Sequence, residues 1–220
     1  MQSASGSLLY NDASRKVITN NRSSVGRGLM TLVPFLDING NGVRDAHEPA
    51  VAGVNIRMNG GRIRYNKQDT TITVSDLEGY ADYTFTISES FENVAWHIRN
   101  KTVKVTIDPN QFKKIEIPVY VMNEVSGIVY FDDKGTRKGL GRVTISFYRK
   151  DFSLAGETVS EADGSFNFSG LPAGEYSAQI SRKQMEKLHM TALPWTTKFT
   201  IVAGRDGDIV DDLEFVLQQR

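Results

Sequence analysis

The chain has 220 residues, of which 40% are apolar and 24% charged, so it is long enough for one large or two ordinary globular domains. Its 26 basic and 26 acidic side chains give a formal net charge of zero, which argues against a general nucleic-acid binder because such a protein needs a cationic surplus. It has no cysteine, and this excludes disulfide scaffolds, thiolate metal sites and cysteine nucleophiles.

The chain begins with a polar lead-in, residues 1–29, in which only residues 8–10 predict a strand. Residues 1–6 lack the basic and apolar regions of a signal peptide, so we expect either a cytosolic protein or a piece of a larger one. No apolar run approaches the ~18 residues of a membrane helix, so we expect no direct membrane insertion of this segment.

Short strand signals then follow one another along the chain. They consist of β-branched and aromatic residues, often alternating with polar ones, and they cover residues 30–36, 54–58, 62–65, 71–74, 80–87, 102–107, 115–121, 125–131, 143–148, 165–168, 176–180, 198–202 and 213–217. One helix is expected, at residues 182–189. Turn residues separate many of the strands at a spacing typical of β-sandwiches, so the sequence predicts an all-β fold.

Two of these strands are joined by Asn59, Gly60 and Gly61. Residues 54–58 and 62–65 both alternate apolar and polar side chains, and Asn-Gly tolerates the positive φ angles of a tight turn. We therefore expect residues 54–65 to form a β-hairpin.

The chain also repeats itself weakly. Phe35-Leu36-Asp37 matches Phe131-Asp132-Asp133, Val54-Asn55-Ile56 matches Val143-Thr144-Ile145, and residues 76–80 match residues 161–165. The offset falls from 96 to 89 residues between the first two matches, so the first copy has the longer loop there. We expect two related β-sandwich domains, residues 1–122 and 123–220, joined by a short strand-to-strand connection that restricts hinge motion.

This longer loop, residues 37–48, carries the one motif with clear chemistry. Against the twelve-position calcium loop, oxygen-bearing side chains fall at positions 1, 3, 5, 9 and 12, with Gly42 at position 6. Calcium takes six to eight oxygen ligands, so we expect a site made by the side chains of Asp37, Asn39, Asn41, Asp45 and Glu48 and by the backbone carbonyl of Val43. An Asn- and Gly-rich surface turn without a metal is the alternative.

The segments on either side of the loop decide what kind of calcium site it is. An EF-hand has a helix on each side, but here residues 30–36 read as a strand and Pro49 precedes the next strand. Without a helix pair to open, a calmodulin-like switch is disfavoured, and we expect a structural ion.

The segment Phe35 to Pro49, continuing from Val51 to Ile56, resembles the B-repeats of Sdr-type bacterial surface adhesins. That resemblance implies a calcium-binding, immunoglobulin-like domain that stiffens a stalk. Residues 125–130, 163–166 and 170–176 resemble carboxypeptidase-regulatory-like and Cna-B-like domains, which implies a second, prealbumin-like sandwich. Residues 125–131 contain no Lys and residues 213–217 no Asn, so the isopeptide cross-link of many Cna-B domains is not expected.

Other chemistry-bearing residues have ordinary explanations. His47, His97 and His189 form no metal or nucleophile pattern, and His47 stands at loop position 11, which is not a ligand position. Trp96 and Trp195 either pack in the core or stack on a sugar. The acidic run 206–212 is either a solvated turn or a second ion site.

These observations predict a non-catalytic, calcium-stabilised structural or adhesive module of a bacterial surface or exported protein, and part of a larger protein. The alternatives are a module that recognises a glycan or a protein, or an accessory domain of an outer-membrane usher-like assembly protein, which the chain resembles more weakly. No Gly-x-Ser-x-Gly, phosphate-loop or His-Glu-x-x-His motif points to an enzyme.

Overall fold

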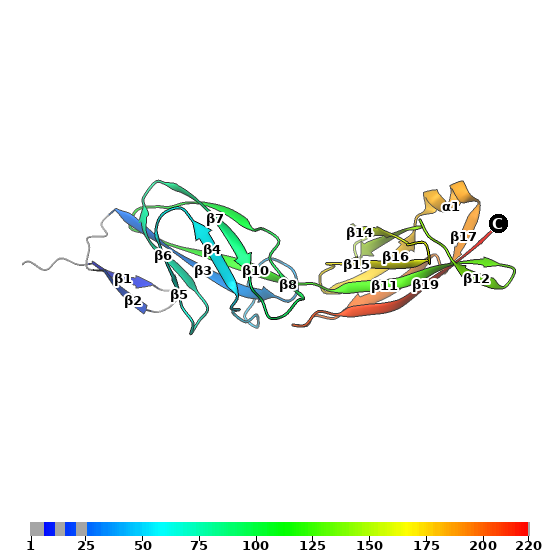
Figure 1. Cartoon of the computed structure of the whole chain (residues 1–220), viewed down its shortest axis with the longest axis horizontal. Helices are drawn as coiled ribbons and strands as arrows, with labels where there is room; N and C mark the ends of the chain where they lie inside the picture. The colour runs from blue at the N-terminus through cyan, green and yellow to red at the C-terminus, as the bar shows by residue number, and fades with distance from the viewer. Residues whose placement is uncertain (1–6, 12–15, 21–25, 220) are drawn as a thin grey trace, which may run out of the picture. The chain divides into compact units, whose positions relative to one another are not determined.

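A computed structural model describes residues 7–11, 16–20 and 26–219 of the chain. The chain divides into two compact units, with the boundary along the sequence at residues 120 and 121, apart from residues 38–40, which cluster with the second unit. Strands dominate both units, and among the described residues the helical ones are confined to one short helix (Figure 1). No helix in the described ranges is long and apolar enough to cross a membrane.

The first unit is built from two sheets that follow a short N-terminal hairpin. The hairpin pairs β1 (Ser7–Asn11) with β2 (Lys16–Asn20) in antiparallel fashion. The larger sheet has the order β5-β6-β3-β10-β8 and the smaller one β4-β7-β9. Their strands are β3 (Arg27–Asp37), β4 (Val54–Met58), β5 (Arg62–Tyr65), β6 (Ile72–Glu78), β7 (Asp82–Glu89), β8 (Trp96–His97), β9 (Thr102–Thr106) and β10 (Phe112–Val121).

The second unit also has two sheets. One has the order β12-β11-β19-β17, with β15 paired to β11, and the other β14-β13-β16-β18. The elements are β11 (Glu124–Asp133), β12 (Thr136–Gly139), β13 (Thr144–Arg149), β14 (Leu154–Val159), β15 (Ser165–Ser169), β16 (Gly174–Ile180), α1 (Arg182–Leu188), β17 (Met190–Leu193), β18 (Thr196–Ile201) and β19 (Ile209–Gln219).

The alternation of side chains explains why these segments form half-buried strands. In β4, Val54 and Ile56 are buried whereas Asn55 and Arg57 are exposed, which is the two-residue period of a strand with one face on a core. In β3, every residue after Arg27 is buried, as expected for an inner strand covered on both faces. The second unit has a core of its own, in which Phe147 and Phe215 are completely buried.

The two units share most of their strand pairing, although β5 joins the larger sheet of the first unit whereas β14 pairs with β13 in the second. The first and last strands pair in parallel, β3 with β10 and β11 with β19. In the opposite sheet of the first unit, β7 lies between β4 and β9. In the opposite sheet of the second unit, β16 lies between β13 and β18. The protein is therefore an all-β tandem of two immunoglobulin-like, prealbumin-like sandwiches, as the strand pattern and the resemblance predicted.

The expected hairpin at residues 54–65 is wrong. β4 pairs with β7 in the smaller sheet, whereas β5 pairs with β6 in the larger one. Gly60 and Gly61 do have positive φ angles of 91° and 73°, but the chain uses them to cross between sheets. A Cβ on Gly61 would lie 2.7 Å from Val74 Cγ1, so this crossing has no room for a side chain. The alternation within each strand does not reveal which sheet it joins.

One of the internal matches is also wrong. Gly79 follows β6, whereas Gly164 precedes β15, although β6 and β15 occupy equivalent places beside β3 and β11. Acidic residues followed by glycine occur at many strand ends, so this match reflected turn chemistry rather than equivalent positions. The two other matches fall on equivalent strands, β3 with β11 and β4 with β13.

Candidate metal centre

The predicted calcium loop lies between β3 and β4, and the strands around it hold its two ends together. Asp37 is the last residue of β3, where it is opposite Tyr120 of β10. The returning chain runs antiparallel to β3, because the N–H of Leu36 donates to the carbonyl of Pro49 at 2.9 Å. A bridge between Phe35 and Ala50 continues this pairing. The first and last positions of the loop are thus anchored to a rigid sheet.

The carboxylates at these two positions are almost completely buried. Asp37 is 1% exposed and Glu48 is 3% exposed. Burying an ionised carboxylate is unfavourable unless hydrogen bonds or opposite charge compensate it. Their position inside the loop is therefore a feature that a plain surface turn does not need.

Hydrogen bonds inside the loop arrange its oxygen-bearing side chains. The Asp37 carboxylate accepts the N–H groups of Asn41, at 3.1 Å, and of Gly42, at 2.7 Å. The Asn41 side chain accepts the N–H of Val43 at 2.7 Å and donates to Asp45 Oδ2 at 3.2 Å. Gly42 has a φ of 79°, so its lack of a side chain permits the sharp turn that position 6 requires. The chain thereby wraps around the Asp37 carboxylate.

The far end of the loop brings its other acidic residues together. The N–H of Asp45 donates to Glu48 Oε2 at 2.9 Å, and the N–H of Glu48 donates to the Asp45 carbonyl at 3.1 Å. Ligand atoms of Asp45, His47 and Glu48 all lie within 4.8 Å of one another. Asp37 is not part of that close group.

His47 is the residue that the spacing argument did not include. Position 11 does not supply a ligand in the twelve-position loop, but here its ring is near two carboxylates. A sequence signal existed, since Asp45-x-His47-Glu48 places three potential ligands within four residues. Of the remaining predicted ligands, Asn39 is half-buried, and Val43 is 62% exposed, as suits a residue expected to offer only its carbonyl.

The donor set suits a hard divalent cation. Buried and half-buried carboxylate and amide oxygens dominate it, and calcium prefers such ligands. The single imidazole nitrogen of His47 would suit a transition metal better. A bound calcium ion would place two positive charges beside the buried carboxylates. Their charge would then be compensated inside the protein, where water does not compensate it.

The other candidate residues have structural surroundings. His97 is half-buried with its ring centroid 6.0 Å from that of Tyr120, and burial, reinforced by the charge of Arg99, lowers the pKa of His97. Trp96 contacts Phe91 edge to face, at 5.9 Å between centroids. His189 lies at the C-terminal cap of α1 in the left-handed conformation.

Trp195 and the acidic residues 206–212 of the second unit also make contacts within the protein. The Arg182 guanidinium lies 3.9 Å from the centroid of the Trp195 ring. Asp208 accepts the N–H of Val202 at 2.6 Å and donates its own N–H to Asn123 Oδ1 at 2.9 Å. Within the described ranges, the acidic residues 206–212 form no three-residue group of potential metal ligands.

Comparison with known proteins gives a distant similarity in fold. No family model matches the chain. No curated protein matches it either. Among solved structures, the minor pilin GBS52 of Streptococcus agalactiae is 13% identical with a TM-score of 0.39, covering 88% of this chain and 96% of that one.

Two further structures give the same picture. The shaft pilin SpaA of Lactobacillus rhamnosus GG is 9% identical with a TM-score of 0.35, covering 88% of this chain and 98% of that one. The Bacillus anthracis TIE protein is 10% identical with a TM-score of 0.36, and the match covers 88% of this chain but only 34% of that protein. Because these TM-scores are low, the fold assignment rests on strand order and pairing. None of the three is an Sdr-type adhesin or an usher, so those resemblances stay predictions.

Proposed function

We propose that this chain is a non-catalytic, calcium-stabilised structural or adhesive module of a larger bacterial surface or exported protein. The observation that carries the proposal is the pair of almost fully buried carboxylates, Asp37 and Glu48, at the two ends of a loop anchored to β3. Burial of both carboxylates favours a bound cation that would balance their charge.

Each predicted ligand has a role in that proposal. Asp37, Asn39 and Asn41 would supply side-chain oxygens from the first half of the loop, and Val43 its backbone carbonyl. Asp45 and Glu48 would complete the site from the second half, where a hydrogen bond already joins them. A bound calcium ion would balance the carboxylate charge and hold the two halves of the loop together.

The flanking strands favour a structural ion over a switch. β3 and β4 border the loop, and neither can open in the way that a helix pair does. Extracellular modules bind calcium with Kd values of about 10⁻⁴–10⁻³ M. At a free calcium concentration of about ten times Kd, binding stabilises the folded state by roughly 1.4 kcal/mol. That is enough to raise the melting temperature by several degrees.

Thermal unfolding in calcium and in chelator tests this proposal. We expect calcium to raise the Tm of the whole chain by a few degrees, and Asp37→Asn and Glu48→Gln each to remove most of that rise. Glu92→Gln, at an exposed acidic residue outside the loop, should keep the full effect. Identical melting curves with calcium and with chelator would contradict the proposal.

The variant His47→Gln tests whether the loop binds calcium or a softer metal. Because nitrogen is a poor ligand for calcium, this variant should keep the calcium-dependent rise in Tm. If the variant loses a stabilisation that zinc produces and calcium does not, the loop is a transition-metal site instead.

A recognition module is the second candidate function. It gains support from a pocket in the second unit, lined by residues between 149 and 200, that the sequence motifs did not reveal.

A further inference from the structure

The second unit contains a pocket of about 440 Å³, which is within the size range of small-ligand sites. It lies where the turn between β13 and β14 meets the neighbouring strands β16 and β18. Tyr176 and Phe199 are opposite each other in those strands, with their rings stacked at 5.6 Å between centroids. Both are buried in the core of the second unit, so the strands that carry the lining residues are held in place.

The charges around the pocket are mainly positive. Arg149, Lys150 and Lys198 line it together with a single carboxylate, Glu175. Lys150 pairs with Glu175 at 2.9 Å. Arg149 donates to the Leu154 carbonyl at 3.3 Å and to the Ser153 hydroxyl at 3.4 Å, and its charge adds to the hydrogen bonds from Ser153 that lower the pKa of Asp151. The hydrogen bond and charge of Lys150 lower the pKa of Glu175, and the charge of Lys198 contributes to the same shift, so Lys198 also lies near that carboxylate. The chain as a whole is neutral, so this is a local excess that suits an anionic ligand.

An aromatic side chain stands at the edge of the pocket. Phe152 is 82% exposed and lies in the left-handed region with a φ of 63°. Its N–H donates to the Arg149 carbonyl at 2.9 Å, and the N–H of Arg149 donates to the Ser153 carbonyl at 2.9 Å, which fixes the turn. Glycine would adopt this conformation with less strain. The phenyl ring therefore lies at an unfavourable backbone position and does not contribute to a core.

Strain alone does not mark a site. Tyr80 in the first unit is equally exposed, at 83%, with a φ of 62°, and it does not line this pocket. Phe152 differs from Tyr80 because it lines a pocket together with cationic side chains and with the hydroxyl-bearing residues Ser177 and Thr200.

We propose that this pocket binds an acidic saccharide, a sugar ring carrying a carboxylate or a sulfate. The apolar C–H face of the ring would pack on the Phe152 phenyl, as sugars do on exposed aromatic rings. The anionic group would pair with Arg149 and Lys198. The Glu175 carboxylate and the hydroxyl groups of Ser177 and Thr200 would bond the sugar hydroxyls.

An acidic peptide fits the pocket less well. Its carboxylates could pair with Arg149 and Lys198, but it brings no hydroxyl group to donate to the Glu175 carboxylate, as a sugar does. A pocket of about 440 Å³ also matches one or two sugar rings better than an extended strand, which binds along a sheet edge.

Titration of the full chain by NMR or calorimetry tests the proposal. The probes are glucuronate, N-acetylneuraminate and galactose 6-sulfate, with neutral galactose and a polyglutamate peptide as comparisons. We expect at least one acidic sugar to bind saturably and to shift amides of residues 149–153, 175–177 and 198–200, and galactose to bind at least about tenfold more weakly. Carboxylated and sulfated probes distinguish the two possible anionic groups.

Four variants locate the binding. Phe152→Gly should abolish it without lowering the Tm, because the substitution relieves the strained φ, and Lys198→Gln should weaken it about tenfold. Tyr80→Gly, at the matched strained aromatic, and Lys138→Gln, at an exposed lysine of β12, should bind as the unchanged chain does.

Three results would overturn the proposal. These are no saturable binding of any acidic sugar stronger than roughly 10 mM, binding of polyglutamate alone, or acidic-sugar binding that survives both Phe152→Gly and Lys198→Gln. The calcium experiment uses other residues, so either proposal can fail without the other.

Discussion

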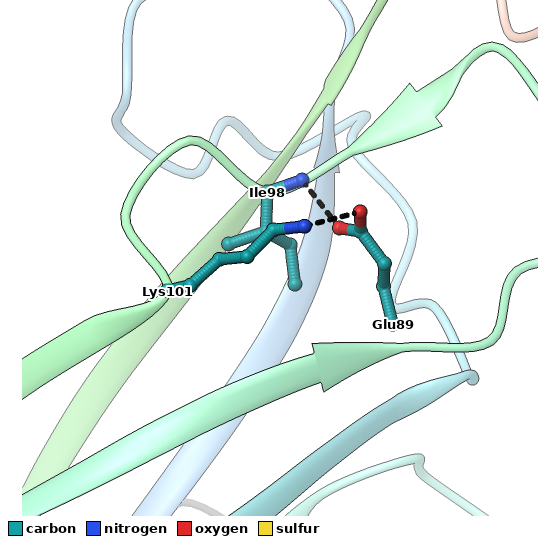
Figure 2. A network of polar contacts seen from close by, with 3 residues as sticks. All are labelled: Glu89, Ile98 and Lys101. Carbon is teal, nitrogen blue, oxygen red and sulfur yellow. Dashed lines mark hydrogen bonds and ion pairs between the residues drawn. The ribbon is translucent and has the colours of Figure 1, made fainter.

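Glu89 shows how one carboxylate organises an irregular part of the first unit. It ends β7, and the chain between β7 and β9 contains only the two-residue strand β8. Its Oε2 accepts the Ile98 N–H at 2.9 Å and its Oε1 accepts the Lys101 ammonium at 2.8 Å (Figure 2). Burial acts to raise the pKa of Glu89, but the hydrogen bonds from Lys101 and Ile98 outweigh it, so the pKa is lowered.

Replacing Glu89 by glutamine should give a pH-dependent loss of stability. A pKa below its ordinary value of 4.5 means that the folded state favours the ionised carboxylate, so the contribution is present above that value and is lost as the pH falls through the folded pKa. We expect Glu89→Gln to lower the free energy of unfolding by about 1 kcal/mol at pH 7. At about pH 3 the difference should shrink.

Urea denaturation at both pH values measures this difference. Glu92→Gln, at an exposed residue three positions along, should change stability little at either pH. An equally large difference for Glu89→Gln at pH 7 and pH 3 would show that side-chain packing rather than charge is responsible.

The composition of the candidate metal centre could be predicted from the sequence, whereas its burial and its neighbours could not. Oxygen-bearing residues at fixed spacing identify Asp37 and Glu48, because ligand chemistry follows from residue type. Their 1% and 3% exposures depend on the pairing of the returning chain with β3, which is a tertiary contact. The proximity of His47 to Asp45 depends on the conformation of the loop, which the spacing of residues in a motif does not specify.

At the scale of elements, Asn123 connects three segments of the second unit. It lies between β10 and β11 and is 4% exposed. Its Nδ2 donates to the Leu171 carbonyl at 2.7 Å, its Oδ1 accepts the Asp208 N–H at 2.9 Å, and its carbonyl accepts the Gly170 N–H at 2.9 Å. The loops before β16 and β19 are thereby joined to the start of β11.

Asn123→Ala should therefore be strongly destabilising. The substitution leaves the Leu171 carbonyl and the Asp208 N–H without the partner they have now, and we expect a loss of about 2–3 kcal/mol in the free energy of unfolding. Asn100→Ala, at an exposed asparagine, should change stability by less than about 0.5 kcal/mol. Chemical denaturation compares the two, and a similar small effect for both would contradict the role assigned to Asn123.

Strong strand patterns were predictable, and pairing partners were not. The alternation at residues 54–58 identifies β4 with its observed bounds, and the helix expected at 182–189 is α1. The sequence analysis missed β2, β8, β12, β14 and β17. None of the side chains of β8, β12, β14 and β17 is buried, which leaves no strong apolar pattern to detect. The joining of β5 to β6 instead of β4 depends on long-range contacts, and local propensity does not encode them.

For the whole molecule, the parallel pairing of the first and last strands in each unit indicates that each unit completes its own sandwich. In the second unit, the buried core consists of residues between 125 and 217, and the first strand β11 pairs with the last strand β19. The assignment of residues 1–122 and 123–220 to two separate domains stays a prediction. It has a direct consequence for a shortened chain.

A chain of residues 121–220 should fold alone, because about 100 residues can bury a sufficient core and this segment contains every strand of its two sheets. We expect a β-type circular dichroism spectrum and a single cooperative transition in urea. Residues 134–220 form the matched control, since they lack β11 and leave β19 and β15 without the strand that lies between them. This shorter chain should not fold. Non-cooperative unfolding of residues 121–220 would mean that the second sandwich depends on the rest of the chain for its stability.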